Sequence, residues 1–292
     1  MNELNYMETG AITRRLNPLA GVGFAVMACL ACASAAHASI ADWNFGTLPV
    51  TAPDNTPAAT GGSAATSAAT TAQALGMTNT YVETGGGGNV STNYDDITQD
   101  TNSTIGNQNV WRIRGAGATA GNGWSTNAPE YSQGVEFTTS TVGYTNVELS
   151  FNWASTKQGI QDLQVQYNTN ANSTTGWTNI GPLEIATIAN SSTGGSFATD
   201  TINFGSLADN DPNFGVRLVS AYNPNLAGGT EYAAASSSFS APTEYNNNSG
   251  NWRFADVQLD GTMTPVPLPA AAWLLLSGLG ALGMTPRKRK NA

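Results

Sequence analysis

Apolar and polar residues alternate along much of the chain. Residues 146–153, with the sequence NVELSFNW, place Val, Leu, Phe and Trp at every second position, with Glu, Ser and Asn between them. Residues 162–168, DLQVQYN, repeat this pattern with Leu, Val and Tyr against two Gln. A period of two is typical of strands with one buried face. Shorter segments of the same kind predict strands at residues 39–50, 109–115, 134–140, 197–204, 213–220 and 251–261.

The last of these segments changes phase within itself. Trp252 and Phe254 fall on one face, whereas Val257 and Leu259 fall on the other, so we expect a β-bulge near Ala255. Outside the two ends of the chain, no window keeps a helical period. About eight to eleven short strands separated by turn residues predict an all-β fold, a two-sheet antiparallel β-sandwich of the jelly-roll type.

The N-terminal segment has the order of a secretory signal. Two arginines precede an apolar run, which ends in the small residues of an AHA site at Ala38. We therefore expect residues 1–38 to form a signal helix that is cleaved on export. A buried N-terminal helix is one alternative, and a lipoprotein acylated at Cys29 or Cys32 is another.

Removal of this segment limits the available chemistry. Both cysteines and the single histidine lie in residues 1–38, so the mature chain would contain neither residue type. Disulfides, His or Cys metal ligands, and nucleophiles or bases of these types are then excluded. Catalysis would need a carboxylate pair, Lys157 with a serine, or a metal held by oxygen atoms.

Charge is sparse and negative in the predicted domain. Between residues 39 and 269, five Lys and Arg side chains stand against eighteen Asp and Glu, which gives a net charge of −13. A surface of this sign repels phosphate backbones, so we expect no nucleic-acid partner. Residues 51–74 contain mostly Ala, Thr, Ser, Gly and Pro, and predict a low-complexity loop within one β-sandwich domain, residues 39–262.

The C-terminal segment, residues 263–292, carries a Pro-rich motif, an apolar run and a basic end. The prolines keep the motif extended, and an apolar transmembrane helix is expected over about residues 268–284. The cations would stay at the cytoplasmic face by the positive-inside rule. Because the run is short for a membrane span, the sequence favours a transient stop cleaved near the motif over a lasting single-pass anchor. The motif is Val266, Pro267, Leu268, Pro269 and Ala270, and the basic end is Arg287, Lys288, Arg289 and Lys290.

This tail closely resembles the VPLPA-CTERM variant of the PEP-CTERM sorting signal, over residues 266–292. The resemblance implies a Gram-negative exporter and an exosortase-like membrane protease as partner. It also implies a mature protein secreted to the cell surface or to an exopolysaccharide matrix. More loosely, residues 142–170, 213–224 and 251–261 resemble the jelly-roll domains attached to such tails. That second resemblance implies a fold and glycan contact, and it carries no catalytic motif.

Two sets of residues are candidates for a site. Asp42 on the first strand and Asp256 on the last would meet if these strands are neighbours, and Ca²⁺ prefers oxygen ligands of this kind. A structural calcium is one hypothesis, and turn formation or surface charge is the other; we expect no further cofactor. Trp124 and Trp177 lie in loop-like sequence, so we expect them to be exposed and available to stack on sugar rings.

The leading hypothesis is a non-enzymatic, exported protein of the cell surface or extracellular matrix that contacts polysaccharide. Two alternatives stay open, a carboxylate-dependent extracellular glycan hydrolase and a glycosylated structural coat protein. A groove with two close carboxylates would favour the hydrolase. An aligned pair of exposed aromatic rings would favour binding, and neither feature would favour the coat.

Overall fold

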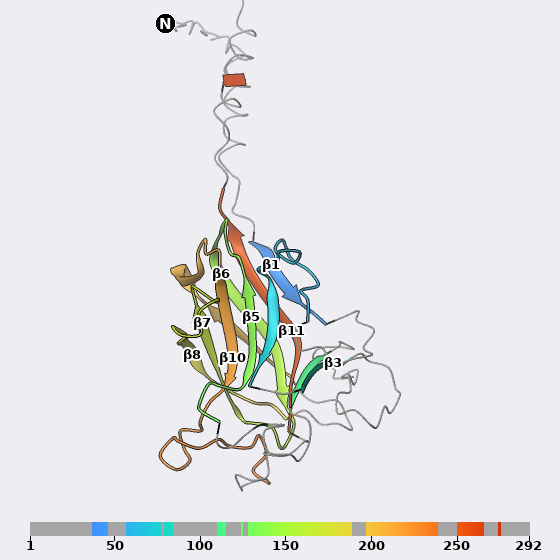
Figure 1. Ribbon diagram of the computed structural model, residues 1–292, viewed down its shortest axis with the longest axis vertical. Coiled ribbons are helices and arrows are strands. Elements are labelled where there is room, and N and C mark those ends of the chain that lie inside the picture. Colours follow the sequence, from blue (N-terminus) through green and yellow to red (C-terminus); the bar gives the residue numbers. More distant parts are fainter. Residues whose placement is uncertain are drawn as a thin grey trace, which may run out of the picture. The chain divides into compact units, whose positions relative to one another are not determined.

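The computed structural model describes residues 37–45, 57–76, 79–83, 110–114, 124, 128–188, 197–238, 250–265 and 274–275. Within these residues the chain forms two antiparallel β-sheets packed face to face (Figure 1). The predicted all-β, two-sheet sandwich is therefore confirmed. A short 3-10 turn, η1 (Gly205–Ala208), follows the ninth strand.

The first sheet, sheet A, has six strands in the order β3-β4-β11-β6-β9, and β1 also pairs with β11. Its longest strands are β6 (Tyr144–Ser155) and β11 (Trp252–Met263). β4 pairs with residues 252–254 of β11 and β1 with residues 257–262, so these two strands follow one another along the same edge of β11. The remaining strands are β1 (His37–Trp43), β3 (Asn79–Glu83), β4 (Val110–Arg114) and β9 (Ala198–Asn203).

The second sheet, sheet B, has five strands in the order β2-β5-β10-β7-β8. Every neighbouring pair is antiparallel. Figure 1 shows β7, β10 and β5 side by side, with the outer face of the sheet toward the viewer. The strands are β2 (Thr71–Leu75), β5 (Gly134–Thr139), β7 (Asp162–Asn168), β8 (Thr178–Ile185) and β10 (Phe214–Ser220).

The core between the sheets is rich in aromatic rings. The Trp252 ring centroid lies 4.6 Å from that of Trp124 and 5.4 Å from that of Trp153, and Trp252 Nε1 donates to the carbonyl of Ile160 at 2.7 Å. Because each indole buries a large area, a chain with polar strands obtains a continuous core from few residues. The inward residues predicted for β6 are all buried: Val147, Leu149, Phe151 and Trp153.

The predicted bulge lies in β11. The pairing of β11 with β6 shifts between Phe254 and Asp256, which leaves Ala255 as the extra residue. The shift lets the apolar residues before and after it face the same core, where they are buried. The prediction of a bulge near Ala255 is confirmed.

The prediction of a loop over residues 51–74 is wrong at its end. Thr71–Leu75 forms β2, which pairs with β5 at the edge of sheet B. An edge strand with small and polar residues is held by backbone pairing more than by burial, so no apolar pattern marks it. β3 and β8 were not predicted either. Residues 57–70 are irregular or form turns, apart from a single bridge between Gly61 and Asp42, and residues 46–56 lie outside the described residues.

The predicted terminal segments lie almost wholly outside the described residues. His37 and Ala38, at the expected cleavage site, belong to β1 and pair with β11. The sorting motif and the basic end are not described, and of the predicted C-terminal helix only residues 274–275 are. In the parts of the chain that the structure describes, no helix has the length and apolar character needed to cross a membrane. The signal, its cleavage and the tail stay predictions.

Candidate functional site

Five polar side chains stand in one row across the outer face of sheet B. Each comes from a different strand, in the order β2, β5, β10, β7 and β8. Residues directly opposite on antiparallel strands leave the same face and lie within contact distance. The row therefore exists because of strand register. Its members, each opposite the next, are Gln73, Glu136, Arg217, Gln166 and Asn179.

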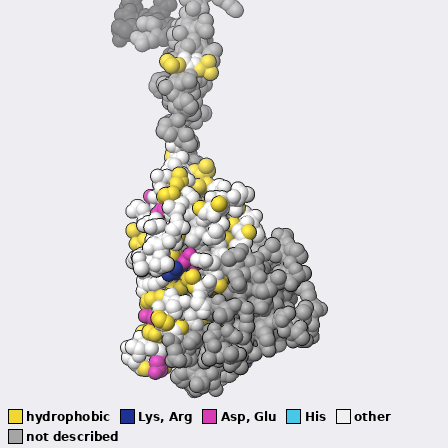
Figure 2. Space-filling view, viewed as in Figure 1, with side chains coloured by type: hydrophobic (Ala, Val, Ile, Leu, Met, Phe, Trp, Pro, Cys, Tyr) yellow, Lys and Arg dark blue, Asp and Glu magenta, His cyan; other side chains and the backbone are white. Residues whose placement is uncertain are grey.

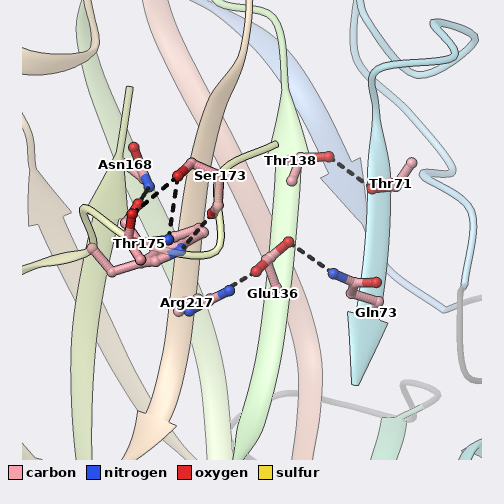
Figure 3. A network of polar contacts seen from close by, with 9 residues as sticks. Thr71, Gln73, Glu136, Thr138, Asn168, Ser173, Thr175 and Arg217 are labelled. Atoms are coloured by element: carbon pink, nitrogen blue, oxygen red, sulfur yellow. Dashed lines mark hydrogen bonds and ion pairs between the residues drawn. The ribbon is translucent and has the colours of Figure 1, made fainter. Parts of the chain in front are cut away.

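Hydrogen bonds connect the row in two groups. Arg217 Nε donates to Glu136 Oε2 at 2.7 Å, and Gln73 Nε2 donates to Glu136 Oε1 at 2.8 Å (Figure 3). Farther along, Gln166 Nε2 donates to Asn179 Oδ1 at 2.8 Å. Glu136 is only 4% exposed, and each of its oxygens accepts a hydrogen bond. A buried carboxylate that is satisfied in this way is fixed in position.

Trp177 holds Arg217 from a second direction. The guanidinium carbon of Arg217 lies 3.8 Å from the centroid of the indole ring, a cation–π contact. Trp177 Nε1 donates to the carbonyl of Ser173 at 3.3 Å. Gly215 leaves the space that this packing needs, because a Cβ there would lie 2.9 Å from Trp177 Cη2 and 2.6 Å from Ala171 Cβ. The Nη atoms of Arg217 form no hydrogen bond with any described residue, so they are available to a ligand.

The loop between β7 and β8 stands beside the row of polar side chains on the outer face of sheet B. Asn168, the last residue of β7, donates from Nδ2 to the carbonyl of Thr175 at 2.9 Å and accepts the N–H of Asn170 at 2.8 Å. The N–H of Ala171 donates to the carbonyl of Asn213 at 2.8 Å, which ties the loop to the residue before β10. Short Asn-based turns of this kind order a surface loop without burying it.

A pocket of about 340 Å³ lies between this loop and the residues just before β2. Glu136 and Arg217 belong to its lining, and the described lining contains no aromatic side chain. Figure 2 shows the same face of the molecule, with a small dark-blue patch beside a magenta one among white and yellow atoms. Hydroxyls and amides come from Thr71, Thr138, Ser173, Thr174, Gln73, Asn172 and Asn213.

The sequence indicated parts of this site but not their assembly. The polar positions of residues 162–168 and 213–220 were predicted to face away from the core, and Gln166 and Arg217 do so. Sequence alternation assigns a face to each residue, but it does not state which residue of another strand stands opposite. Trp177, in the loop between β7 and β8, was a candidate from the sequence, but β2 and the rest of that loop carried no signal of their own.

The expected pair of exposed tryptophans is corrected. Trp124 is fully buried, with its ring tilted against Trp252. Loop-like sequence does not exclude burial, because a loop residue can fold back over an open part of the core. Trp177 is half-buried and lies against Arg217. These two rings therefore do not form an aligned exposed platform.

The two aspartates proposed as neighbours do meet. β1 lies beside β11, where Asp42 stands opposite Gln258 and one diagonal step from Asp256, and the two carboxyl groups share a hydrogen bond. Burial, followed by the charge of Asp42, raises the pKa of Asp256 to about 6. Burial also raises the pKa of Asp42. A proton shared between the carboxyls offsets their repulsion.

The predicted calcium ligands are thus close together, but they form a small donor set. The buried Asp42 Oδ1 and Ser39 Oγ have no hydrogen-bond partner, and oxygen atoms of this type suit a hard cation. Among the described residues, however, no group of three or more His, Cys, Asp or Glu could hold a metal ion. Calcium at Asp42 and Asp256 stays a prediction.

A second carboxyl pair, not indicated by the sequence, lies where the edges of the two sheets meet. Glu184 of β8 and Asp200 of β9 share a hydrogen bond, and burial followed by the charge of Asp200 raises the pKa of Glu184 to about 7. Trp153 Nε1 donates to Asp200 Oδ2 at 2.6 Å. Cross-sheet pairs cannot be read from local sequence because they depend on how two sheets stack.

Neither pair has the arrangement of a glycosidase. Glycoside hydrolysis needs two carboxyl groups about 5–10 Å apart on either side of a sugar bond. The carboxyls of both pairs are in direct contact, which leaves no room for that bond. In the described lining of the pocket, Glu136 is the single carboxylate, and both of its oxygens are engaged.

No protein-family model matches the chain, and no curated protein sequence matches it. Solved structures with a similar arrangement of strands include the CBM22-1–CBM22-2 tandem domain of Paenibacillus barcinonensis Xyn10C, with 12% identity and a TM-score of 0.38. That match covers 81% of this chain and 50% of the other, so the chain spans half of the protein it matches.

Two further matches are of the same order. The CBM22-1–GH10 modules of a Clostridium thermocellum endo-1,4-β-D-xylanase, solved with xylohexaose, show 11% identity and a TM-score of 0.31, covering 65% of this chain and 26% of the other. The K1 cleaved adhesin domain of Porphyromonas gingivalis Lys-gingipain shows 10% identity and a TM-score of 0.33, covering 62% of this chain and 88% of the other. Likeness this distant assigns the chain to no family and carries no inference about its ligand.

Proposed function

We propose that the protein is an exported, non-enzymatic saccharide-binding protein of the cell surface or extracellular matrix. The binding site in this proposal is the pocket on the outer face of sheet B. The observation that carries the proposal is the Glu136–Arg217 pair, fixed by Gln73 and Trp177 within a lining of hydroxyls and amides.

The chemistry of this lining suits a sugar. A sugar hydroxyl both donates and accepts, and amide and hydroxyl side chains and the Nη atoms of Arg217 offer both kinds of partner. Because strand register and the neighbouring side chains already hold these groups, little side-chain order is lost on binding. Small-molecule pockets occupy about 300–1,000 Å³, so a pocket of about 340 Å³ suits a sugar ring or a chain end.

The non-enzymatic part of the proposal rests on the occupied carboxylate. A general acid or base must be free to exchange a proton with the substrate. Glu136 instead accepts from Arg217 and Gln73 while nearly buried. The hydrolase alternative would require a second carboxylate, which the described lining lacks.

Export and sorting are proposed from the sequence. The signal ending at Ala38 would direct the chain out of the cytoplasm. The motif at residues 266–270 and the basic end at residues 287–290 would hold it transiently in the inner membrane for an exosortase-like protease. The saccharide pocket would then meet exopolysaccharide outside the cell.

The binding proposal is tested on a saccharide array with the purified protein and two threonine variants. Thr138→Val removes a hydroxyl of the pocket that lies 2.7 Å from the Thr71 hydroxyl. Thr199→Val removes a similarly bonded hydroxyl, which donates to Asn152 on sheet A. We expect at least one bound saccharide, about tenfold weaker binding by Thr138→Val, and no change with Thr199→Val. An array on which no saccharide is retained would reject the proposal and favour the structural coat.

A further inference from the structure

We infer that the pocket selects uncharged saccharides, and that Glu136 is the residue that excludes acidic ones such as uronates. The inference rests on the proposed function, since it names the class of sugar that the same pocket accepts.

The first step is the charge of the pocket. Its described lining contains one cation, Arg217, and one carboxylate, Glu136, in contact through Arg217 Nε and Glu136 Oε2 at 2.7 Å. A uronate carboxylate entering the pocket would be attracted by the guanidinium and repelled by Glu136 at a comparable distance. It would still have to lose its hydration shell. A neutral hydroxyl carries no such cost and can still accept from the Nη atoms of Arg217.

The second step is that this neutralisation is fixed. The two side chains are 18% and 4% exposed, and Glu136 cannot turn away without breaking its bonds to Arg217 and Gln73. Trp177 restrains the guanidinium from its face. β5 and β10, which carry the pair, lie side by side within sheet B and not at its edge. The pair therefore stays together when a ligand arrives.

The third step is to separate this local effect from the overall charge. The predicted domain is strongly negative, which by itself disfavours polyanions. Loss of one remote charge changes that background little, because solvent and salt screen charges more than about 10 Å apart. Loss of the Glu136 charge leaves Arg217 unpaired in the pocket. An unpaired guanidinium binds a carboxylate through paired, charge-assisted hydrogen bonds.

The experiment uses an array of acidic oligosaccharides of galacturonate, glucuronate, mannuronate and guluronate, each beside its carboxyl-reduced form. The measured quantity is the preference of the purified protein for the acidic over the reduced form. We expect the wild type to prefer reduced forms. Glu136→Gln keeps the shape of the side chain and an oxygen for Arg217, and we expect it to shift the preference toward acidic forms by about tenfold.

The matched control is Glu148→Gln. Glu148 lies on β6 of sheet A, opposite Asp260, so the substitution removes one carboxylate from the other sheet. We expect the preference of this variant to equal that of the wild type.

Thermal unfolding of each protein shows whether Glu136→Gln folds. If it does not, a second variant also gives the pocket a net positive charge. Gln73→Lys adds a cation next to Glu136 at an exposed position of the edge strand β2. It makes the pocket net positive without removing a buried group, and it should also shift the preference toward acidic forms.

The outcomes separate the inference from the proposed function. A wild type that prefers acidic forms would overturn the inference and leave saccharide binding in place. If Glu136→Gln and Glu148→Gln show the same preference between acidic and reduced forms, the inference is likewise overturned and saccharide binding stays in place. A wild type that binds neither form of any sugar removes the proposed function. The inference then fails with it unless Glu136→Gln or Gln73→Lys retains acidic sugars.

Discussion

Glu184 and Asp200 join the two sheets through one hydrogen bond between their carboxyl groups. Glu184 stands opposite Leu163 in sheet B and Asp200 opposite Phe151 in sheet A. Leu163 and Phe151 are core residues, so both carboxyl groups project from the inner faces of the sheets, which pack against each other. Burial, followed by the neighbouring charge of Asp200, raises the pKa of Glu184 and so favours its protonated form.

Stability is expected to fall as the pH rises through about 7. The pKa of Glu184 is raised to about 7, so the folded protein holds this proton more tightly than the unfolded chain does. The resulting stabilisation is complete below the ordinary Glu pKa and is lost as the pH rises through the folded value. Asp256, with a pKa raised to about 6, acts with the same sign at lower pH. Thermal unfolding should give a higher Tm at about pH 5 than at about pH 8.

Glu184→Gln isolates the contribution of this pair. The amide can donate to Asp200 without titrating, so the Tm difference between the two pH values should shrink. Glu148 does not belong to the Glu184–Asp200 pair, so Glu148→Gln should keep the Tm difference of the wild type between the two pH values. A wild-type Tm that rises between these pH values would contradict the assignment.

If calcium binds at Asp42 and Asp256, chelation should lower the Tm. At neutral pH the shared proton of the pair is largely lost, and a divalent cation would then offset the repulsion. An ion that binds only to the folded state stabilises that state by mass action. Asp256→Asn should abolish the response to EDTA. Identical unfolding curves of the wild type with excess EDTA and with added calcium would remove calcium from this site.

Gly215→Ala should damage the pocket and the fold together. The added Cβ would lie 2.6 Å from Ala171 Cβ and 2.9 Å from Trp177 Cη2, so the loop between β7 and β8 must move. We expect a loss of about 1–3 kcal/mol in the free energy of unfolding, measured with denaturant, and weaker saccharide binding. Ala171→Gly in the same chain returns part of the space, and failure of this second change to restore any stability would contradict the packing argument.

Substitution of two tryptophans should separate stability from binding. Trp252→Ala empties the centre of the aromatic cluster and leaves the carbonyl of Ile160 without its donor, so we expect a loss of about 3–5 kcal/mol in the free energy of unfolding. Trp177→Ala removes a half-buried ring against Arg217 and should weaken saccharide binding while costing about 1 kcal/mol. Equal losses of stability would show that Trp177 is a core residue.

The tail prediction is decided by mass spectrometry of the protein from its native host. We expect the mature population to end near residues 265–270, because a short apolar run after an extended Pro-rich segment suits cleavage better than anchoring. A mature chain that still ends at Ala292 would support the lasting anchor instead.

The sequence alone determined where most strands lie and which face of each is buried. The alternation in residues 146–153 placed Phe151 and Trp153 in the core, and the phase change around Ala255 located a bulge. These features are local, since a period of two follows from the geometry of one strand. Edge strands such as β2 and β8 were not predicted, because backbone pairing holds them and leaves no apolar pattern in the sequence.

Only the tertiary structure decided which residues act together. Glu136 and Arg217 are 81 residues apart, and they meet because β5 and β10 pair in one register. A shift of one residue in strand register would turn every side chain of that strand to the other face, and the five polar side chains would no longer stand opposite one another. Glu184 and Asp200 meet through the stacking of two sheets, and Trp124 is buried against Trp252, a residue 128 positions away in the sequence. Local sequence sets each side chain's face, whereas its partners depend on contacts between strands that are distant along the chain.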